Sequence, residues 1–267
     1  MNIDSPPYRL AQRLWLALRR TLETMVPRNQ LDRWLDKAGF FTFKAGHFRR
    51  LRALPGGSLI AYRPDDEKII NEIHGCANPG GQYSRGAIAD GDVVFDVGAH
   101  IGVFSVYAAR KNPHGRIIAV EPAPFNLELL RENIARNGLR NVKIYPCAVS
   151  DHSGEARLFS FGDHALYSLE SPAPGLLSTP ARLRTLDDIF EAEGLAVCHL
   201  LKVDIEKSEL PALKGGRRML AATRQVILEA SKENGIHEQA ASFLRSLGFT
   251  CSTEFDSPEA EIIYAHR

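Results

Sequence analysis

Four acidic residues stand at the ends of short apolar segments, where they could bind a nucleoside and accept a proton. They are Asp96, Glu121, Asp204 and Glu229. If each segment is a strand of a parallel sheet, the four carboxylates meet at one edge, because the carboxyl ends of parallel strands lie together. A carboxylate at that edge can accept hydrogen bonds from ribose hydroxyls or act as a general base. The spacing therefore predicts a nucleoside site beside a reacting group.

A glycine turn separates the first two acids. The segment 93–102 predicts a buried strand with Asp96 near its end, then a turn with Gly98 and Gly102, and then a helix. Because glycine lacks Cβ, we expect the backbone to turn sharply there and a ligand to lie against it. Asp96 is placed to bind an amine or a cation. Glu121 ends the next predicted strand, where an acid can accept hydrogen bonds from both ribose hydroxyls.

This turn resembles motif I of the class I S-adenosylmethionine-dependent methyltransferases, and the longer pattern resembles the FkbM family of O-methyltransferases. The resemblance covers roughly residues 66–265. Its motifs are Asp96–Gly102, Glu121–Pro124, Asn133, Asn137, Ala148–Asp151, Thr185–Asp188 and Lys202–Glu206. It implies a Rossmann-like α/β fold with a mostly parallel seven-stranded sheet, an antiparallel C-terminal hairpin and an N-terminal helical extension.

The resemblance implies a cofactor, S-adenosylmethionine, and transfer of its methyl group to a hydroxyl of a glycan or small natural product. We expect Glu121 to bind the ribose, and Asp96 to act through water or on the amino group of the methionine part. In the family, the segment at Ala148 and Val149 passes the adenine ring. The residues expected at the cofactor are Asp96, Gly98, Ala99, His100, Gly102, Glu121, Pro122, Ala148 and Val149.

Asp204 and Glu229 are the candidates for acting on the acceptor. Methyl transfer from a sulfonium is an in-line displacement, and a hydroxyl is a poor nucleophile until its proton is removed. Asp204 can serve as the base or as a ligand of a divalent metal, with Glu229 as its partner. The alternative role for Asp204 is that of a helix N-cap. Tyr83 precedes the first core strand, and we expect it to shape the methionine end of the site.

Two positions depart from the family pattern. The family usually has asparagine where His100 stands and glycine where Lys207 stands. Lys207 adds bulk and charge on the acceptor side, which keeps open the alternative of a non-catalytic or diverged binding protein on the same fold. A third hypothesis is a nicotinamide-dependent oxidoreductase. The turn lacks the G-x-G-x-x-G spacing that brings a diphosphate onto a helix N-terminus, which argues against this class.

Strands and helices alternate along the chain, which indicates a parallel sheet with right-handed crossovers. We expect strands over 93–97, 116–120, 142–146, 199–204 and 225–230, helices over 102–111, 124–137, 208–220 and 236–247, and a closing antiparallel pair over 249–255 and 260–266. Gly215 and Gly216 predict a break in the helix over 208–220. Thr185 and Asp188 resemble a capping box. Residues 152–184 predict an irregular insertion with one strand near 156–161.

The chain before residue 65 predicts an N-terminal extension, and residues 65–267 predict the methyltransferase domain. Residues 1–52 carry 11 Lys and Arg against 4 Asp and Glu, a charge of +7, whereas the rest carries 22 against 28, a charge of −6. Leucines recur at helical spacing within 8–25, which favours a helix packed on the domain or on a partner subunit. The alternative is an amphipathic basic helix on an anionic membrane surface. Residues 58–62 predict a strand that pairs with the segment before it.

Composition limits the remaining classes. A length of 267 residues with 44% hydrophobic residues suits one α/β domain with an added element. The net charge of +1 argues against a dedicated nucleic-acid binder. The four cysteines show no metal or redox spacing. No segment resembles a membrane span or a signal peptide, so we expect a cytoplasmic protein whose partner is a small-molecule or saccharide acceptor.

Overall fold

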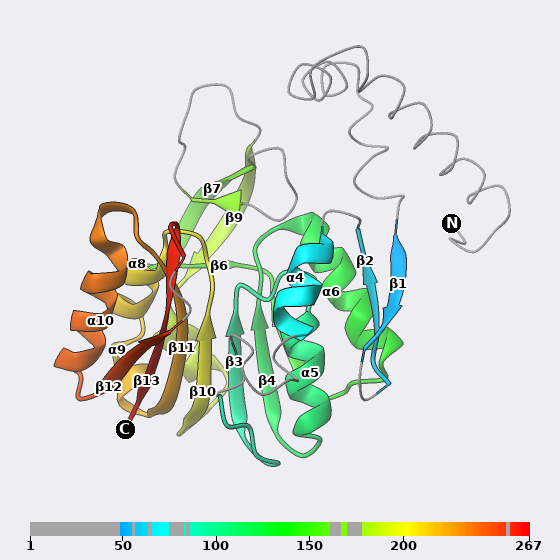
Figure 1. The fold of residues 1–267 in the computed structure, drawn as a ribbon, viewed down its shortest axis with the longest axis horizontal. Coiled ribbons are helices and arrows are strands. Elements are labelled where there is room, and N and C mark those ends of the chain that lie inside the picture. The colour runs from blue at the N-terminus through cyan, green and yellow to red at the C-terminus, as the bar shows by residue number, and fades with distance from the viewer. Residues whose placement is uncertain are drawn as a thin grey trace, which may run out of the picture.

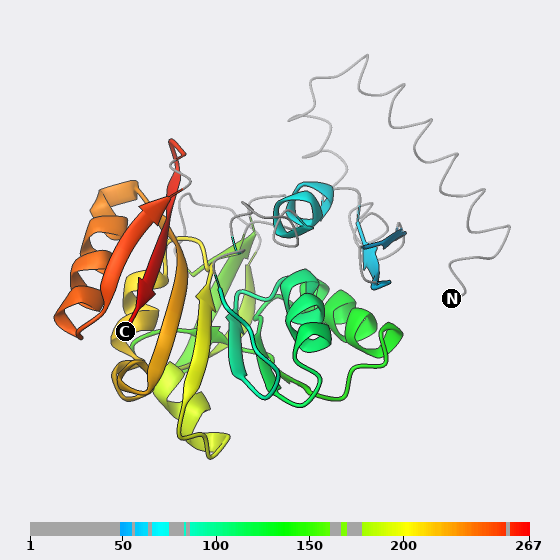
Figure 2. The same ribbon diagram turned by 60° about the horizontal axis from the view of Figure 1, so that its bottom comes forward.

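The computed structural model describes residues 49–54, 57–63, 66–74, 83, 86–160, 167–169, 178–254 and 257–267. The predicted helix over 8–25 and the rest of the basic region before residue 49 lie outside the described residues. The described part is built around a seven-stranded sheet with helices on both faces (Figures 1 and 2). None of its helices has the length and apolar character that a bilayer crossing requires.

The main sheet has the strand order β12-β13-β11-β10-β3-β4-β5. Its strands are β3 (Val93–Val97), β4 (Arg116–Val120), β5 (Val142–Tyr145), β10 (Cys198–Val203), β11 (Thr223–Ser231), β12 (Thr250–Glu254) and β13 (Ala260–His266). β13 is antiparallel to both β11 and β12, whereas the pairs among β5, β4, β3, β10 and β11 are parallel. The predicted mostly parallel sheet with an antiparallel C-terminal pair is confirmed.

β3 is the middle one of the five parallel strands, and all five of its residues are buried. A strand covered on both faces is typically a continuous apolar run, and here the run is interrupted only by Asp96. From β3 the chain passes outward through β4 to β5, and later returns to β10 on the other side of β3. The strand order therefore reverses at β3, and in open α/β sheets such a reversal creates a crevice at the carboxyl ends of the strands.

The helices divide into two layers. One face is covered by α4 (Glu67–His74), α5 (Val103–Lys111) and α6 (Pro124–Arg136), and the other by α7 (Leu186–Ala192), α8 (Glu209–Lys214), α9 (Arg217–Ala221) and α10 (Ile236–Ser246), with the 3-10 turn η3 (Glu233–Gly235) before α10. Each layer packs on its own apolar core. The side chain of Thr185 caps α7 by accepting the backbone N–H of Asp188 at 3.0 Å. Gly215 and Gly216 separate α8 from α9, so both predictions are confirmed.

The predicted strand near 156–161 is confirmed, because residues 154–160 form a strand, but the prediction that the rest of 152–184 is irregular is wrong for the described residues. β6 (Ala148–Val149), β7 (Gly154–Ser160), β8 (Tyr167–Ser168) and β9 (Ser178–Arg184) form a second sheet of order β6-β9-β7-β8. β7 and β9 pair in antiparallel fashion from Gly154 opposite Leu183 to Phe159 opposite Ser178. The sequence of β9 is largely polar, so local propensity favours a strand only weakly. Its strand conformation depends mainly on the pairing with β7. The second sheet lies beyond the carboxyl ends of β3, β4 and β10 (Figure 1).

A hairpin of β1 (Arg50–Ala53) and β2 (Leu59–Tyr62) confirms the predicted pairing in this region. Asn133 of α6 bonds both backbone groups of Ala61, with Oδ1 2.7 Å from the N–H donor and Nδ2 2.9 Å from the carbonyl oxygen. Asn137 bonds Leu59 in the same way, at 3.0 and 2.7 Å. The two side-chain amides thus make the hydrogen bonds that a neighbouring strand would otherwise make with β2. The division of the chain at residue 64 stays a prediction, and the described hairpin before it is bonded to the core.

Candidate active site

The four predicted acids lie at the carboxyl ends of β3, β4, β10 and β11. Backbone bonds draw the connecting loops together there: the N–H groups of Gly98 and Ala99 donate to Val120 O at 2.9 and 3.0 Å, and Asp204 N–H donates to Val97 O at 3.0 Å. The loops after β3, β4 and β10 are therefore joined. The structure brings the acids together in two groups, one around Glu121 and one around Asp204.

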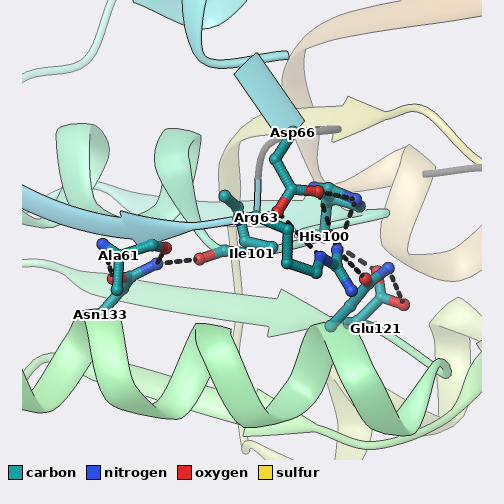
Figure 3. Close-up of polar contacts among 8 residues, drawn as sticks. Ala61, Arg63, Asp66, His100, Ile101, Glu121 and Asn133 are labelled. Carbon is teal, nitrogen blue, oxygen red and sulfur yellow. Dashed lines mark hydrogen bonds and ion pairs between the residues drawn. The ribbon is translucent and has the colours of Figure 1, made fainter. Parts of the chain in front are cut away.

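Glu121 is held by the loops around it, and only 5% of the residue is exposed. Its Oε2 accepts the backbone N–H of His100 at 2.9 Å (Figure 3). Its Oε1 accepts the backbone N–H of Ala123 at 2.8 Å. The side-chain amide of Asn126 donates to Oε1 at 3.3 Å. A carboxylate has about four lone-pair sites, and these donors use both sites of Oε1 and one of Oε2, so Oε2 can still accept a hydroxyl of a ligand. Burial raises the pKa of Glu121 to about 7, although these hydrogen bonds and the charge of Arg63 oppose the rise.

Arg63 and Asp66 complete this group, and the sequence reasoning missed both. Arg63 donates through Nε to Asp66 Oδ2 at 2.9 Å and through Nη2 to Asp66 Oδ1 at 2.8 Å (Figure 3). Nη2 also donates to Asn126 Oδ1 at 2.7 Å. His100 Nε2 lies 3.6 Å from Asp66 Oδ1. The segment Arg63–Pro64–Asp65–Asp66 offers no sequence signal for this role, because it reads as an ordinary polar turn before α4.

Asp96 is fully buried and engaged with the protein. Its Oδ2 accepts the hydroxyl of Ser105 at 2.6 Å, and Lys202 Nζ lies 3.2 Å from its Oδ1. Lys202 also donates to Gly98 O at 3.1 Å and lies 3.5 Å from Asp204 Oδ2. The role expected for Asp96, on the methionine amino group, stays a prediction. What the structure shows is a buried ion pair that fixes the glycine turn.

Lys202 is almost fully buried in β10, with its ammonium 5.4 Å from the ring centre of Tyr83. Burial acts to lower the pKa of Lys202, but the Asp96 and Asp204 carboxylates outweigh it and raise that pKa above its ordinary value. The ammonium therefore stays charged between two carboxylates. A lysine inside an apolar central strand is rarely buried without a partner, and that is the signal by which the sequence could have assigned this ion pair.

Asp204 and Glu229 are joined by the hydroxyl of Tyr83. The Tyr83 hydroxyl lies 3.3 Å from Asp204 Oδ2 and 3.1 Å from Glu229 Oε2, and Tyr83 is 3% exposed. The Asp204 side chain is 33% exposed, so it can meet a ligand. Burial, and then the charge of Asp204, raise the pKa of Glu229 to about 7. The alternative that Asp204 is a helix N-cap is wrong, because the N-cap position of α8 is Ser208.

Gly98 and Gly102 both have positive φ, +81° and +86°. A Cβ on Gly98 would lie 1.8 Å from the carbonyl oxygen of Asp204, and one on Gly102 would lie 2.5 Å from Leu130 Cδ1. We expected a ligand to lie against these glycines. The structure gives each a protein neighbour: Gly98 lets the loop of Asp204 approach, and Gly102 lets α6 pack under the turn. Contact with a ligand at either glycine stays a prediction.

Of the remaining predicted cofactor residues, two lie in the same loops and two lie in β6. Ala99 is 4% exposed, and Pro122 is half-buried beside Glu121. Ala148 and Val149 are buried in β6, where they pair with Leu183 and Arg184 of β9. Their proposed contact with adenine is not shown by these neighbours. Among the described residues, no group of three or more His, Cys, Asp and Glu side chains is arranged to hold a metal ion.

Both departures from the family pattern fall where the backbone is left-handed. His100 has φ +51° and Lys207 has φ +72°. Asparagine and glycine are the residues that tolerate this conformation best. The Lys207 side chain forms an ion pair with Glu233, and its backbone N–H donates to Glu209 Oε1 at 2.8 Å. The loop after Asp204 thus keeps a shape that suits glycine.

Comparison with known proteins agrees with this fold. Residues 96–251 match the family profile described as the methyltransferase FkbM domain, so the chain belongs to the FkbM methyltransferase family. It is 32% identical over 204 residues to the 31-O-demethyl-FK506 methyltransferase FkbM of Streptomyces tacrolimicus, which covers 62% of this chain and 75% of that protein. It is 29% identical over 199 residues to methyltransferase sdnD of Sordaria araneosa, covering 62% and 77%.

Solved structures also resemble the chain, though more distantly. Fibrillarin from Aeropyrum pernix, solved with bound S-adenosyl-L-methionine, aligns with a TM-score of 0.47 at 12% identity, covering 82% of this chain and 83% of that one. The family match makes the protein an S-adenosylmethionine-dependent methyltransferase, and its sheet topology is consistent with that class. The residues present fit this cofactor, because a buried carboxylate whose Oε2 can still accept a hydroxyl lies beside a glycine turn at the reversal of strand order.

Proposed function

We propose that this methyltransferase transfers the methyl group of S-adenosylmethionine to a hydroxyl of a small molecule or saccharide. The observation that carries the proposal is the group of Asp204, Tyr83 and Glu229, in which two carboxylates share one buried hydroxyl at the carboxyl edge of the sheet. Such a pair is suited to accept the proton of an alcohol. The name of the Streptomyces relative, which describes methylation at an oxygen of a small molecule, supports the same reaction type.

The cofactor side of the site is formed by the glycine turn and Glu121. S-adenosylmethionine supplies an electrophilic methyl group on a sulfonium. The carboxylate of Glu121 would accept a hydrogen bond from a ribose hydroxyl on Oε2, and its orientation is already set by the N–H groups of His100 and Ala123. Because these donors are fixed before binding, little ordering is left to oppose association.

The acceptor side depends on the charge distribution around Asp204. One face of its carboxylate is held by Lys202 and Tyr83, and the exposed part can accept a hydrogen bond from an incoming hydroxyl. With a pKa of about 7, Glu229 can take up a proton near neutral pH. The proton of the acceptor can thus pass to Asp204 and be shared through Tyr83 with Glu229. Lys202 acts as a positioning residue for Asp204.

The test compares Asp204→Asn with the wild type in two measurements. Release of S-adenosylhomocysteine is followed with a panel of polyhydroxylated acceptors, and binding of S-adenosylhomocysteine is followed by calorimetry. Loss of one general base typically lowers a rate by about 10²–10⁴-fold. We expect turnover to fall by that amount while the affinity for S-adenosylhomocysteine changes less than about threefold. Retained turnover in Asp204→Asn would rule out an essential carboxylate at this position.

The pH profile of the wild type provides a second check on the same group. Protonated Glu229 cannot accept a proton, so we expect kcat to rise as pH increases through about 7. The Tyr83 hydroxyl lowers the pKa of Glu229 by donating to it. Tyr83→Phe should therefore shift the rising limb to higher pH. A shift to lower pH, or none, would contradict the assignment of that limb to Glu229.

A further inference from the structure

Arg63 is a buried cation with one terminal nitrogen that has no partner. The residue is 3% exposed, and its Nε and Nη2 atoms are used by Asp66 and Asn126. The other terminal nitrogen, Nη1, is buried and has no hydrogen-bond acceptor in the described part of the chain. Leaving a buried donor unsatisfied is unfavourable, more so when the group is charged. An orphaned guanidinium nitrogen of this kind indicates a place where a ligand supplies the acceptor.

The surroundings of Arg63 indicate which part of a ligand would be there. Arg63 extends from the end of β2 toward His100 and Glu121 (Figure 3). Asn126 connects the two charged residues, since its Oδ1 accepts from Arg63 at 2.7 Å and its Nδ2 donates to Glu121 Oε1 at 3.3 Å. Arg63 Nη2 also lies 3.5 Å from His100 Nε2. A cationic donor and a carboxylate with one acceptor site left are therefore held close together through Asn126.

We propose that Arg63 is a cofactor-binding residue whose Nη1 donates a hydrogen bond to a ribose hydroxyl oxygen of S-adenosylmethionine. The proposal rests on the proposed role of Glu121 at the ribose. A hydroxyl can donate its hydrogen to the Glu121 carboxylate and accept on its oxygen from the guanidinium, so the pair satisfies both halves of one group. Asp66 is the positioning residue, because it holds the guanidinium through two parallel bonds.

This assignment extends the cofactor site beyond the segment that matches the family. The match begins at residue 96, whereas Arg63 follows the hairpin of β1 and β2. The hairpin is fixed to α6 by Asn133 and Asn137, and α6 begins directly after the loop of Glu121. The N-terminal part of the chain thus supplies one wall of the ribose pocket, and α6 sets its distance from the carboxylate.

The charge of Arg63 also affects the protonation of Glu121. The groups around Glu121 are Arg63 after β2, Asp66 at the start of α4, His100 of the glycine turn and Asn126 of α6. Burial raises the pKa of Glu121 to about 7, and this rise is opposed by the hydrogen bonds from Ala123, His100 and Asn126 and, less strongly, by the charge of Arg63. Ribose hydroxyls donate to the ionised carboxylate, so cofactor affinity should fall as pH decreases through about 7. Without Arg63 the pKa of Glu121 rises further, and the fall in affinity begins at a higher pH.

The experiment is a calorimetric titration between pH 6 and pH 9. The ligands are S-adenosylhomocysteine and 5′-methylthioadenosine, which has the same adenine and ribose but no amino-acid part. The proteins are wild type, Arg63→Gln, Arg63→Lys and the control Arg50→Gln, which lies on the same hairpin with a 44% exposed side chain. We expect Arg63→Gln to lower the affinity for both ligands by the same factor, about tenfold or more. The pH at which affinity begins to fall should also be higher in this variant than in wild type. Arg63→Lys keeps the positive charge, so it should shift the pH dependence of affinity less. Arg50→Gln should have the affinity and the pH dependence of wild type.

The contact is tested independently with ligands that lack one ribose hydroxyl. In wild type, the 2′-deoxy or the 3′-deoxy form of 5′-methylthioadenosine should bind more weakly than the parent. In Arg63→Lys, removal of the same hydroxyl should lower the affinity less, because the guanidinium contact with that hydroxyl is already lost. This variant retains a buried cation for Asp66, so the test remains available if Arg63→Gln does not fold, which its thermal unfolding curve would show.

Three results would overturn the proposal. One is unchanged affinity in both Arg63 variants, and another is a loss for S-adenosylhomocysteine without a loss for 5′-methylthioadenosine, which would put the guanidinium on the amino-acid part. The third is equal cost of the hydroxyl deletion in wild type and Arg63→Lys. Absence of S-adenosylhomocysteine binding by wild type would overturn the role of Glu121 as well. Binding without turnover would count against methyl transfer alone.

Discussion

At the scale of single residues, Lys207 is where the chain departs most from its family. It follows Asp204 closely and has φ +72°, a conformation that costs a residue with a Cβ about 1–2 kcal/mol. Its side chain is drawn into an ion pair with Glu233, and its backbone N–H is used by Glu209. The loop therefore has a conformation that suits glycine, and Lys207 is held in it despite the backbone strain of its positive φ. It does not by itself favour a binding protein without activity.

Replacing Lys207 by glycine distinguishes strain from lost function. Lys207→Gly removes the left-handed penalty but adds unfolded-state entropy and loses an exposed ion pair, so we expect a net stabilisation of about 0.5 kcal/mol. Urea unfolding measures it. The control Lys214→Gly, in α8, should lose about 1 kcal/mol, because glycine disfavours a helix. Turnover should stay within about twofold of wild type. A large gain of turnover in Lys207→Gly would instead show that Lys207 suppresses the reaction.

At the scale of elements, the glycine turn and the loop after β10 are packed against each other. Gly98 has φ +81° and stands where any Cβ would collide with the carbonyl oxygen of Asp204. Lys202 connects the same two loops, because it donates to Gly98 O and forms ion pairs with both Asp96 and Asp204. The cofactor turn and the candidate base thus share one rigid contact, and a shift of one element displaces the other.

Gly98→Ala tests this coupling against Gly138→Ala. Gly138 also has positive φ, +65°, but has no atom within 4 Å of a Cβ built on it. Gly138→Ala should therefore cost only the backbone strain, about 1–2 kcal/mol. Gly98→Ala should cost about 1–3 kcal/mol more, because the overpacked contact must open, and it should also abolish turnover. The two unfolding free energies are compared in urea. Equal costs in the two variants would mean that the turn moves without disturbing Asp204.

The sequence predicts those features of the fold and site that depend on neighbouring residues, and it does not predict those that depend on residues far along the chain. The central strands, the carboxylates at their ends and the cap at Thr185 follow from short patterns, and the structure confirms them. The pairing of β9 with β7 and the approach of Arg63 to Glu121 depend on partners far along the chain. Neither a polar strand nor a lone arginine carries a period or spacing that identifies such a partner.

At the scale of the whole molecule, the two edges of the sheet have different roles. The carboxyl edge holds the buried carboxylates, Lys202 and Tyr83. The opposite edge has a cavity of about 350 Å³ lined by Ala87, Ile88, Ala89, Asp92, Lys111, His199, Arg224 and Gln225. There His199 accepts the backbone N–H of Val93 at 2.9 Å and lies 3.6 Å from Asp92. These contacts tie β10 to the start of β3, so this edge contributes to the integrity of the sheet.

His199→Ala should separate stability from cofactor binding. The change leaves the N–H of Val93 without its acceptor, which costs about 1–3 kcal/mol if the group stays dry and less if water enters the cavity. We expect a lower urea midpoint with the slope unchanged. Affinity for S-adenosylhomocysteine should remain that of wild type, because the contacts around Glu121 lie at the other ends of the strands. Glu121→Ala is the reciprocal variant. It should lose about tenfold or more in affinity, since a charge-assisted hydrogen bond contributes about 1.5–3 kcal/mol. If His199→Ala weakened cofactor binding as much as Glu121→Ala, the two edges would be coupled through β3, and the assignment of the chemistry to the carboxyl edge alone would fail.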